Sequence, residues 1–130
     1  MPFVRISLRK DLADGAKERI SEVIHDALVQ EFRIPQNDYF HIIEELDAHQ
    51  IKYPKEYLSI SHSDNIVFIK IVAATGRSVE QKRKLYSEIG HGISKNTNIR
   101  IEDIIIILIE NDGYNNWSFG NGEMQKPKHI

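Results

Sequence analysis

The sequence predicts an α+β fold, a two-layer α/β sandwich in which two tandem βαβ units form a four-stranded mixed sheet, with two helices on one face and short extra strands. Three observations support this prediction. Four alternating or continuous apolar runs indicate strands, and two stretches with apolar residues at three- and four-residue steps indicate helices. The chain also overlays on itself with a shift of 65 residues. Right-handed crossovers would place both helices on the same face of the sheet.

The first unit is predicted as strand, helix and strand. Residues 3–8 alternate between apolar and polar side chains, which is typical of a strand. Apolar residues then recur at helical spacing over 16–32. Pro35 ends this helix, because the residue before a proline avoids the helical region. Residues 39–46 form the second strand of the unit.

The second unit repeats this order. Residues 66–72 are a strongly apolar strand, residues 75–77 a turn, and the helix that follows ends at 96–98. The last strand, 103–109, is an unbroken run rich in β-branched residues. Such a run indicates a parallel strand that is buried on both faces.

Capping residues precede both predicted helices. Asp11 or Asp14 is expected to cap the first helix, because short polar side chains accept hydrogen bonds from its free N–H groups. Ser78, with Gln81 three residues later, matches a capping box for the second helix.

Two stretches depart from the simple pattern. Residues 47–64 are polar and aperiodic, and a connection of this length usually has a task or a structure of its own. Within it, residues 57–60 are predicted as a short edge strand. In the second helix, Gly90 and Gly92 each cost roughly 1 kcal/mol relative to Ala. We therefore expect close packing of that helix against the sheet at both glycines.

The 65-residue shift needs no gap and relates residues 2–46 to residues 67–111 within a single domain, 1–130. With both helices on one face, the sequence leaves no further helix to cover the other face. We therefore expect other subunits of the same chain to cover it. The identical pairs are Phe3 and Phe68, Ile6 and Ile71, Lys17 and Lys82, Ile24 and Ile89, Ile34 and Ile99, Asp38 and Asp103, Ile42 and Ile107, and Glu45 and Glu110.

The composition excludes several classes of protein. The 130 residues carry a net charge of −2 with dispersed Lys and Arg, which argues against binding of nucleic acid. No cysteine is present, so thiol catalysis, disulfides and cysteine metal sites are excluded. The N-terminus has no signal peptide, and the longest apolar run, 104–109, is too short to cross a membrane. We expect a soluble cytoplasmic protein that acts without membrane or nucleic-acid partners.

No motif for a metal ion or a cofactor is present. None of the six histidines forms a metal-spaced pair, and no phosphate-binding loop or nucleotide fingerprint occurs. We therefore expect neither a metal nor a cofactor. The histidines are His25, His41, His49, His62, His91 and His129.

Pro2 has the most unusual chemistry in the chain. If Met1 is removed, as is usual before a small residue, the nitrogen of Pro2 becomes a secondary amine with a free lone pair. Such an amine can act as a base, an acid or a nucleophile. The strand over 3–8 would fix it at the end of a sheet, where a pocket can surround it. The alternative is that Pro2 is a tolerated first strand residue.

Taken in order, these features resemble the tautomerase superfamily, whose namesakes include 4-oxalocrotonate tautomerase and macrophage migration inhibitory factor. The sequence looks most like its malonate semialdehyde decarboxylase group, through residues 34–39, 76–82 and 117–122. The resemblance implies a homotrimer, an amino-terminal proline as catalytic group and small oxo-acid substrates. Some members carry a second arginine two positions before the one matched by Arg77, and this chain has Thr75 there. Proton transfer is therefore a firmer expectation than decarboxylation.

The resemblance gives three residues a catalytic interpretation. Burial of the Pro2 amine would disfavour its charged form, and a neutral amine can act as general base. Arg77, just before a capped helix, would bind a substrate carboxylate, and the alternative is a solvated arginine in a turn. Asp38 would activate a water or steer Pro2. The repeat offers an alternative, because Asp103 stands at the equivalent position and both could simply make turn hydrogen bonds.

Three aromatic residues are candidates for the wall of a substrate pocket. Trp117 and Phe119 lie two residues apart, so on a short strand they would share a face near Pro2. Ordinary packing in a core or an interface explains them equally well. Tyr39 is a weaker candidate of the same kind.

Three functional hypotheses remain open. The leading one is keto–enol tautomerisation of a small 2-oxo acid by Pro2. The second is decarboxylation or hydration of an oxo acid similar to malonate semialdehyde. The third is a binding or signalling protein that keeps the fold without turnover.

Overall fold

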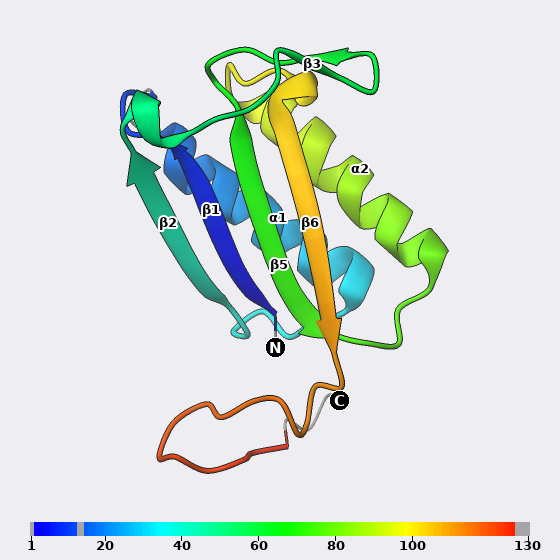
Figure 1. Cartoon of the computed structure of the whole chain (residues 1–130). Helices are drawn as coiled ribbons and strands as arrows, with labels where there is room; N and C mark the ends of the chain where they lie inside the picture. Colours follow the sequence, from blue (N-terminus) through cyan, green and yellow to red (C-terminus); the bar gives the residue numbers. More distant parts are fainter. Residues whose placement is uncertain (1, 13–14, 127–130) are drawn as a thin grey trace.

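The structure is a computed structural model, and it describes residues 2–12 and 15–126. Within these residues a four-stranded sheet is covered on one face by two α-helices, and a two-stranded sheet lies beside it (Figure 1). The predicted fold class is confirmed. The elements are β1 (Phe3–Arg9), α1 (Ala16–Phe32), β2 (Phe40–Leu46), η1 (Ala48–Gln50), β3 (Glu56–Tyr57), β4 (Ile60–Ser61), β5 (Val67–Ala74), α2 (Val79–Asn96), η2 (Ile101–Asp103) and β6 (Ile104–Asn111).

The large sheet has the strand order β2-β1-β5-β6. β1 is parallel to β2, β5 is parallel to β6, and the two central strands are antiparallel. Phe3 pairs with Phe40 and Phe68 pairs with Ile105, so partner residues are 37 positions apart in both parallel pairs. The two βαβ units therefore have the same internal register, and they meet through their antiparallel first strands at the centre of the sheet.

The core lies between the sheet and the two helices. Ile6 of β1 and Ile69 of β5 are directly paired and fully buried, and Ile24 of α1 and Ile89 of α2 are buried with them in one cluster. Each such side chain stabilises the fold by roughly 1.5–3 kcal/mol relative to an exposed one. No helix in the described part of the chain is long and apolar enough to span a membrane.

The two helices begin differently. The capping box at α2 is confirmed, because the Ser78 side chain accepts from the Gln81 N–H and the Gln81 side chain accepts from the Ser78 N–H. The prediction that Asp11 caps α1 is wrong. The N-cap of α1 is Gly15, with φ of 88°, and the Asp11 carboxylate instead accepts hydrogen bonds from Arg9. Asp14 lies outside the described residues.

The two glycines of α2 mark close packing, but not against the sheet as predicted. A Cβ at Gly92 would lie 2.7 Å from Cγ1 of Val23 in α1. A Cβ at Gly90 would lie 3.2 Å from Cγ1 of Ile101 in η2. The glycines therefore let α2 approach its neighbouring helix and the turn before β6. The sequence of one helix shows that a glycine allows close packing, but it does not show which element packs there.

The long connection between the units contains a hairpin. The prediction of one edge strand over 57–60 is wrong, because these residues span a turn between two short strands, β3 and β4, which pair with each other. Leu58 and Ser59 form the turn between them with φ of 52° and 65°. Two-residue hairpin turns favour positive φ at both central positions, although non-glycine residues adopt it at some cost.

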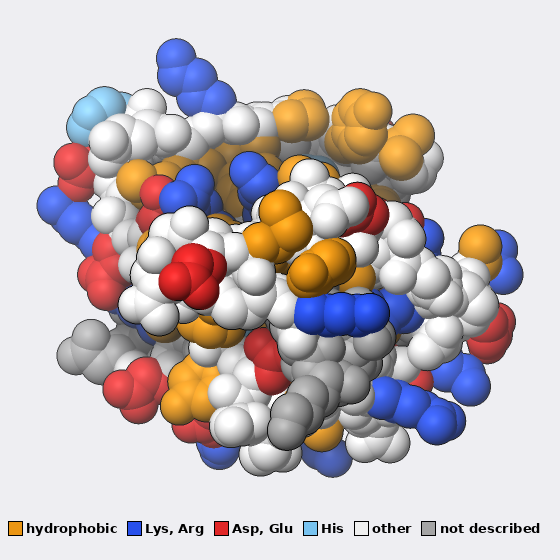
Figure 2. Space-filling view, turned by 90° about the horizontal axis from the view of Figure 1, so that it is seen from below, with side chains coloured by type: hydrophobic (Ala, Val, Ile, Leu, Met, Phe, Trp, Pro, Cys, Tyr) orange, Lys and Arg blue, Asp and Glu red, His pale blue; other side chains and the backbone are white. Residues whose placement is uncertain are grey.

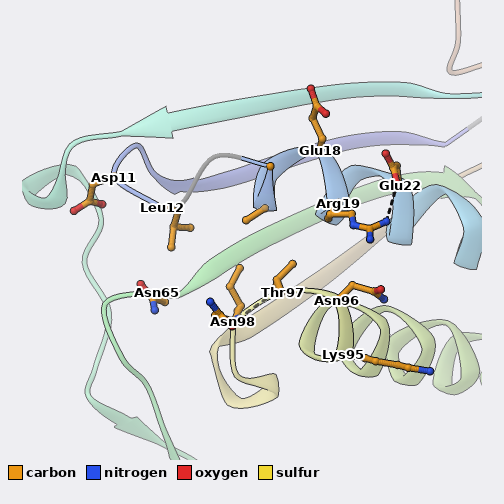
Figure 3. A pocket seen from close by; sticks show the side chains of 13 residues that line it. Asp11, Leu12, Glu18, Arg19, Glu22, Asn65, Lys95, Asn96, Thr97 and Asn98 are labelled. Carbon is orange, nitrogen blue, oxygen red and sulfur yellow. Dashed lines mark hydrogen bonds and ion pairs between the residues drawn. The ribbon is translucent and has the colours of Figure 1, made fainter.

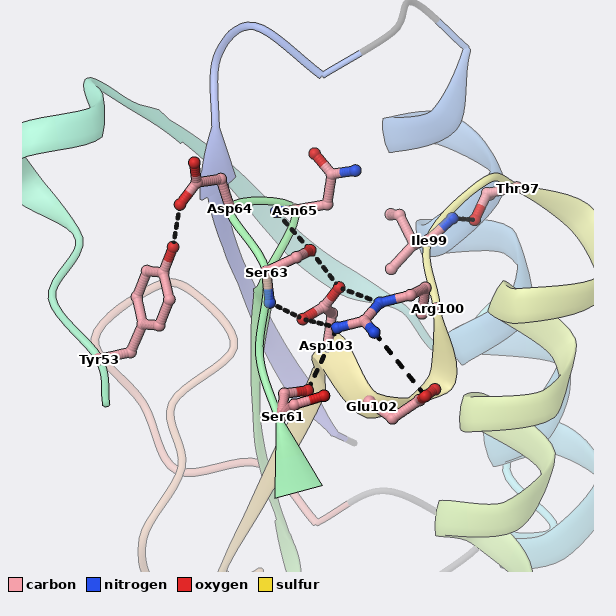
Figure 4. A network of polar contacts seen from close by, with 10 residues as sticks. All are labelled: Tyr53, Ser61, Ser63, Asp64, Asn65, Thr97, Ile99, Arg100, Glu102 and Asp103. Atoms are coloured by element: carbon pink, nitrogen blue, oxygen red, sulfur yellow. Dashed lines mark hydrogen bonds and ion pairs between the residues drawn. The ribbon is translucent and has the colours of Figure 1, made fainter. Parts of the chain in front are cut away.

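Asp103 anchors this connection to the second unit (Figure 4). Its buried carboxylate accepts hydrogen bonds from the backbone N–H and the hydroxyl of Ser63 and from Arg100. Burial raises the pKa of Asp103, but these hydrogen bonds outweigh burial and hold the pKa below its usual value. Arg100 also donates to the Ser61 carbonyl, at 3.2 Å.

The face of the large sheet that carries no helix is partly exposed and carries both apolar and cationic side chains. One row across it consists of Ile42, Arg5, Lys70 and Ile107, in that order. β6 is an edge strand, and its Ile107 is 47% exposed. The prediction that this strand is buried on both faces is therefore wrong for the single chain. The Arg5 Nε atom is buried without a hydrogen-bond partner, 3.8 Å from a carboxylate oxygen of Glu44.

A histidine pair joins the edge strand β2 to α1. His41 of β2 shares a 2.8 Å hydrogen bond with the Ser21 hydroxyl, and its ring centroid lies 6.1 Å from that of His25. Burial of the ring, reinforced by the nearby His25, lowers the pKa of His41 from 6.5 to about 4. His41 is therefore neutral in the folded protein at neutral pH.

We expect His41 to make the fold sensitive to mild acid. The lowered pKa means that its contribution is complete above pH 6.5 and is lost as pH falls towards 4. Because the ring is partly exposed, we expect a loss of about 1–2 kcal/mol in unfolding free energy. Urea unfolding at pH 7.5 and 4.5 should show a smaller loss for His41→Asn than for the wild type. The control is His91→Gln on the exposed face of α2, and equal losses for all three proteins would contradict this assignment.

Candidate functional site

Pro2, Asp38 and Arg77 lie at the same end of the large sheet (Figure 1). The first residue of β1 pairs with the first residue of β2 and, on its other side, with Val72 near the end of β5. Pro2 is buried directly before β1. It therefore lies between the segment that precedes β2 and the turn that follows β5.

Arg77 is half-buried and fixed by three contacts. Its guanidinium donates to the carbonyl oxygens of Ala74 and Phe32, each at 3.1 Å, and lies 4.8 Å from the centroid of the Phe32 ring. Burial lowers the pKa of Arg77 from its usual value, and the carboxylates of Glu110 and Asp38 oppose that change. A guanidinium has five N–H donors, so up to three are left for a ligand.

The same contacts give Arg77 a role in the fold. The last carbonyls of a helix have no partner within it. Arg77 donates to the Phe32 carbonyl and Gln81 donates to the Glu31 carbonyl, at 3.1 Å, so residues at the start of α2 close the end of α1. Gly76, with φ of 115°, permits the turn that brings Arg77 there.

Asp38 lies in a turn that is repeated in the second unit. Its N–H donates to the Pro35 carbonyl at 3.0 Å, and Asp103 makes the equivalent bond to Arg100 at 3.0 Å. The surroundings differ. Asp103 is bonded to the segment before β5, whereas Asp38 stands beside the segment before β1, which contains Pro2. Both the turn and the functional interpretation of Asp38 are therefore compatible with its position.

The sequence predicted that Trp117 and Phe119 lie on a short strand, and this prediction is wrong. Trp117 and Phe119 belong to an irregular segment, and their rings stack on each other at 5.4 Å and 5°. Phe119 in turn lies 5.9 Å from the ring of Phe40. We call Trp117, Phe119 and Phe40 the aromatic wall. Since Phe40 is the strand partner of Phe3, the wall reaches the residue that follows Pro2.

Tyr39 faces away from this wall. Its ring packs against His25 at 5.2 Å, beside α1, and it is 60% exposed. Tyr39 is next to Asp38 in sequence but takes no part in the stack of the aromatic wall.

Four residues that sequence reasoning missed shape this end of the sheet. Phe32 supplies a carbonyl and a ring to Arg77, and Phe40 completes the aromatic wall. Asn111 accepts a hydrogen bond from the Trp117 indole at 3.0 Å, and Gln125 accepts one from the Phe119 N–H at 2.8 Å. Only Asn111 had a local signal, since it opens an Asn-Asp-Gly turn.

Viewed from this end, the surface is hollowed (Figure 2). Hydrophobic side chains gather in the hollow behind a rim of the chain, and Lys or Arg side chains lie among them. An apolar hollow with a few cationic groups suits a small organic anion.

A separate cavity of about 850 Å³ lies at the opposite end, between the start of α1 and the end of α2 (Figure 3). Its lining is polar and of mixed charge, and none of the predicted site residues belongs to it. In the described ranges no three His, Asp or Glu side chains come together as a metal site. The cavity between α1 and α2 is lined by residues that include Leu12, Glu18, Arg19, Glu22, Asn65 and Lys95.

Two sequence families match the chain, and both are described as tautomerase enzymes. One matches residues 38–120 and the other residues 2–52. The probable tautomerase YusQ of Bacillus subtilis (strain 168) is 34% identical over 125 residues, which cover 96% of this chain and 98% of the relative.

Solved structures with a similar fold are also found. FG41 malonate semialdehyde decarboxylase, inhibited by 3-bromopropiolate, superposes with a TM-score of 0.85 at 29% identity, covering 93% of this chain and 91% of that one. The wild-type symmetric trimer of the Q0 fused 4-OT superposes with a TM-score of 0.76 at 18% identity, covering 94% of each chain. At that identity the second likeness shows the fold alone.

Proposed function

The chain belongs to the tautomerase family of enzymes, and from this premise we propose that it catalyses keto–enol tautomerisation of a small 2-oxo acid, with the amine of Pro2 as acid and base after removal of Met1. The observation that supports this proposal is that buried Pro2, Arg77 and the aromatic wall belong to segments at one end of the sheet. Buried amines favour the neutral form, which a general base requires.

In this mechanism Arg77 holds the substrate carboxylate and Pro2 moves one proton. The neutral amine accepts the proton of the enol hydroxyl, and the electron pair on oxygen forms the carbonyl. The resulting ammonium then returns the proton to the neighbouring carbon. Asp38 would support the charged amine in between, because a nearby carboxylate stabilises an ammonium. The aromatic wall would bound the apolar part of the substrate.

Decarboxylation or hydration of an oxo acid similar to malonate semialdehyde is the second candidate. The likeness to FG41 malonate semialdehyde decarboxylase supports it. Thr75 argues against decarboxylation, because some members of that group have a second arginine at this position. A binding protein without turnover is the third candidate, and it would follow if Met1 were retained, since Pro2 would then carry an amide.

We expect Pro2 to control the pH dependence of turnover. Tautomerisation by the neutral amine should rise with pH as Pro2 loses its proton, whereas decarboxylation by the ammonium should fall through the same pH range. Pro2→Ala should lose about 100-fold or more in kcat, the range ascribed to general acid–base catalysis. The measurement is a pH–rate profile on phenylenolpyruvate, with the N-terminal mass of each protein determined.

Two results would count against the role of Pro2. One is equal activity of Pro2→Ala and wild type, both with Met1 removed. The other is full activity in protein whose mass shows that Met1 is still present. Sedimentation of Pro2→Ala checks that the assembly is unchanged.

Arg77→Ala should weaken binding of carboxylate substrates. Charge-assisted hydrogen bonds contribute about 1.5–3 kcal/mol, so we expect kcat/KM to fall roughly 10- to 150-fold. Arg77 also closes the end of α1, so thermal unfolding must be measured beside activity. Arg83→Ala removes an exposed charge from α2 and serves as the control. The anion-binding role is wrong if the free acid and its methyl ester lose activity equally.

We propose that the helix-free face of the sheet is covered in a homotrimer. This face exposes the apolar side chains of Phe40, Ile42, Ile107 and Ile109, and a contiguous exposed apolar patch is typical of an interaction surface. The fused 4-OT of the same fold is a symmetric trimer, which supports this number of subunits.

Sedimentation equilibrium at micromolar concentration should give the mass of three chains. Ile107→Glu should dissociate the trimer, because it places a charge in the middle of the helix-free face. The matched control is Val79→Glu, since Val79 is also apolar and is 61% exposed but lies at the start of α2. A stable wild-type monomer would refute the assembly, and dissociation by Val79→Glu would refute the proposed interface.

A further inference from the structure

Asn111, the last residue of β6, contacts two sides of the proposed site at once. Its backbone oxygen accepts a hydrogen bond from the Thr75 N–H at 2.7 Å, at the start of the turn that leads to Arg77. Its side-chain Oδ1 accepts from the Trp117 Nε1–H at 3.0 Å and from the Gly113 N–H at 2.9 Å. One residue therefore connects the arginine turn with the aromatic wall.

The side-chain oxygen of Asn111 is fully used by these two bonds. A carbonyl oxygen has two lone pairs, and the indole N–H of Trp117 can only donate. Trp117 and Asn111 are both partly buried, and Gly113 is buried. Truncation of the Asn111 side chain would leave two donors without their partner at a place with little water, which costs more than the average hydrogen bond contributes.

The internal repeat shows which interactions of Asn111 the βαβ unit needs and which it does not. With the shift of 65 residues, Asn111 corresponds to Leu46 and Thr75 to Lys10. The Lys10 N–H donates to the Leu46 carbonyl at 2.9 Å, so the same backbone bond closes both units. In the first unit a leucine makes it. The βαβ unit therefore needs the backbone of this residue and not an amide side chain.

The amide sets the orientation of the Trp117 ring. The ring is stacked on Phe119 at an interplanar angle of 5°, and stacking fixes the plane of the ring but leaves it free to flip about its Cβ–Cγ bond. The hydrogen bond from Nε1 removes that freedom. We propose that Asn111 is a positioning residue that fixes Trp117 relative to Arg77 and so sets the width of the pocket for the apolar part of a 2-oxo acid. The inference rests on the proposed function.

Fluorescence tests the geometric half of the proposal, because Trp117 is the only tryptophan in the chain. Asn111→Ala should shift its emission to longer wavelength and increase quenching by acrylamide. Asn111→Asp keeps an acceptor oxygen at this place and should behave as wild type. Asn115→Ala, in the same segment, is the control and should change neither signal. Wild-type emission and quenching in Asn111→Ala would overturn the proposal.

Kinetics test the functional half. Asn111→Ala should raise KM for phenylenolpyruvate about tenfold, the factor that corresponds to one ordinary hydrogen bond, with a smaller change in kcat and the same pH profile. Trp117→Phe removes the same bond from the other partner and should have a similar effect. The double variant should be no worse than either single one, because the two changes remove one interaction.

The outcomes distinguish this inference from the proposed function. Additive effects in the double variant, with normal turnover in the wild type, would overturn the role of Asn111 alone. Absence of turnover in wild-type protein with Met1 removed would reject the proposed function and, with it, the kinetic role of Asn111. In both cases thermal unfolding of each variant shows whether the fold is intact.

Discussion

The antiparallel pairing of β1 with β5 decides which residues of this protein can meet. Each βαβ unit is parallel within itself, so its two strands start at one end of the sheet and finish at the other. Joining the units antiparallel places the start of the first unit beside the finish of the second. Pro2, which precedes β1, thereby lies at the same end of the sheet as Arg77, which follows β5. A parallel junction would have placed Pro2 beside the segment that contains Ser63.

The same pairing gives two aspartates with the same local backbone structure different neighbours. Asp38 and Asp103 occupy equivalent turns, and each donates its N–H to the carbonyl three residues earlier. Asp103 meets the long connection before β5, where Ser63 and Arg100 satisfy its carboxylate. Asp38 meets the segment before β1 and contributes to the field at Arg77. A repeat therefore supplies two similar turns, and only the neighbouring segments decide what each carboxylate does.

The sequence predicted the features that depend on local pattern. Apolar spacing gave the bounds of α1, the capping box gave the start of α2, and the 65-residue shift gave the two βαβ units. Several of the errors concern contacts between elements. Gly92 packs on Val23 of another helix, and a glycine carries no information about which surface approaches it.

The candidate site shows the same limit. Pro2, Asp38 and Arg77 carry recognisable chemistry, so sequence reasoning could select them. Phe32 acts through its backbone carbonyl and its ring, and nothing in its own pattern distinguishes it from a core phenylalanine. It acquires its role only because the end of α1 lies beside the start of α2.

Arg77 shows why a residue that supports the fold can also suit a binding site. Two of its donors are bound to carbonyls of different elements and its plane rests on Phe32, so the guanidinium has little freedom left. Binding a carboxylate to a group already held in place loses little side-chain entropy. Closing the end of α1 with a cation is also favourable to the helix dipole. A lysine could supply the charge, but its single ammonium could not hold two carbonyls, stack on a ring and still present a planar fork. The contacts that stabilise the junction of the two helices are therefore the same contacts that orient the guanidinium proposed to bind the substrate carboxylate.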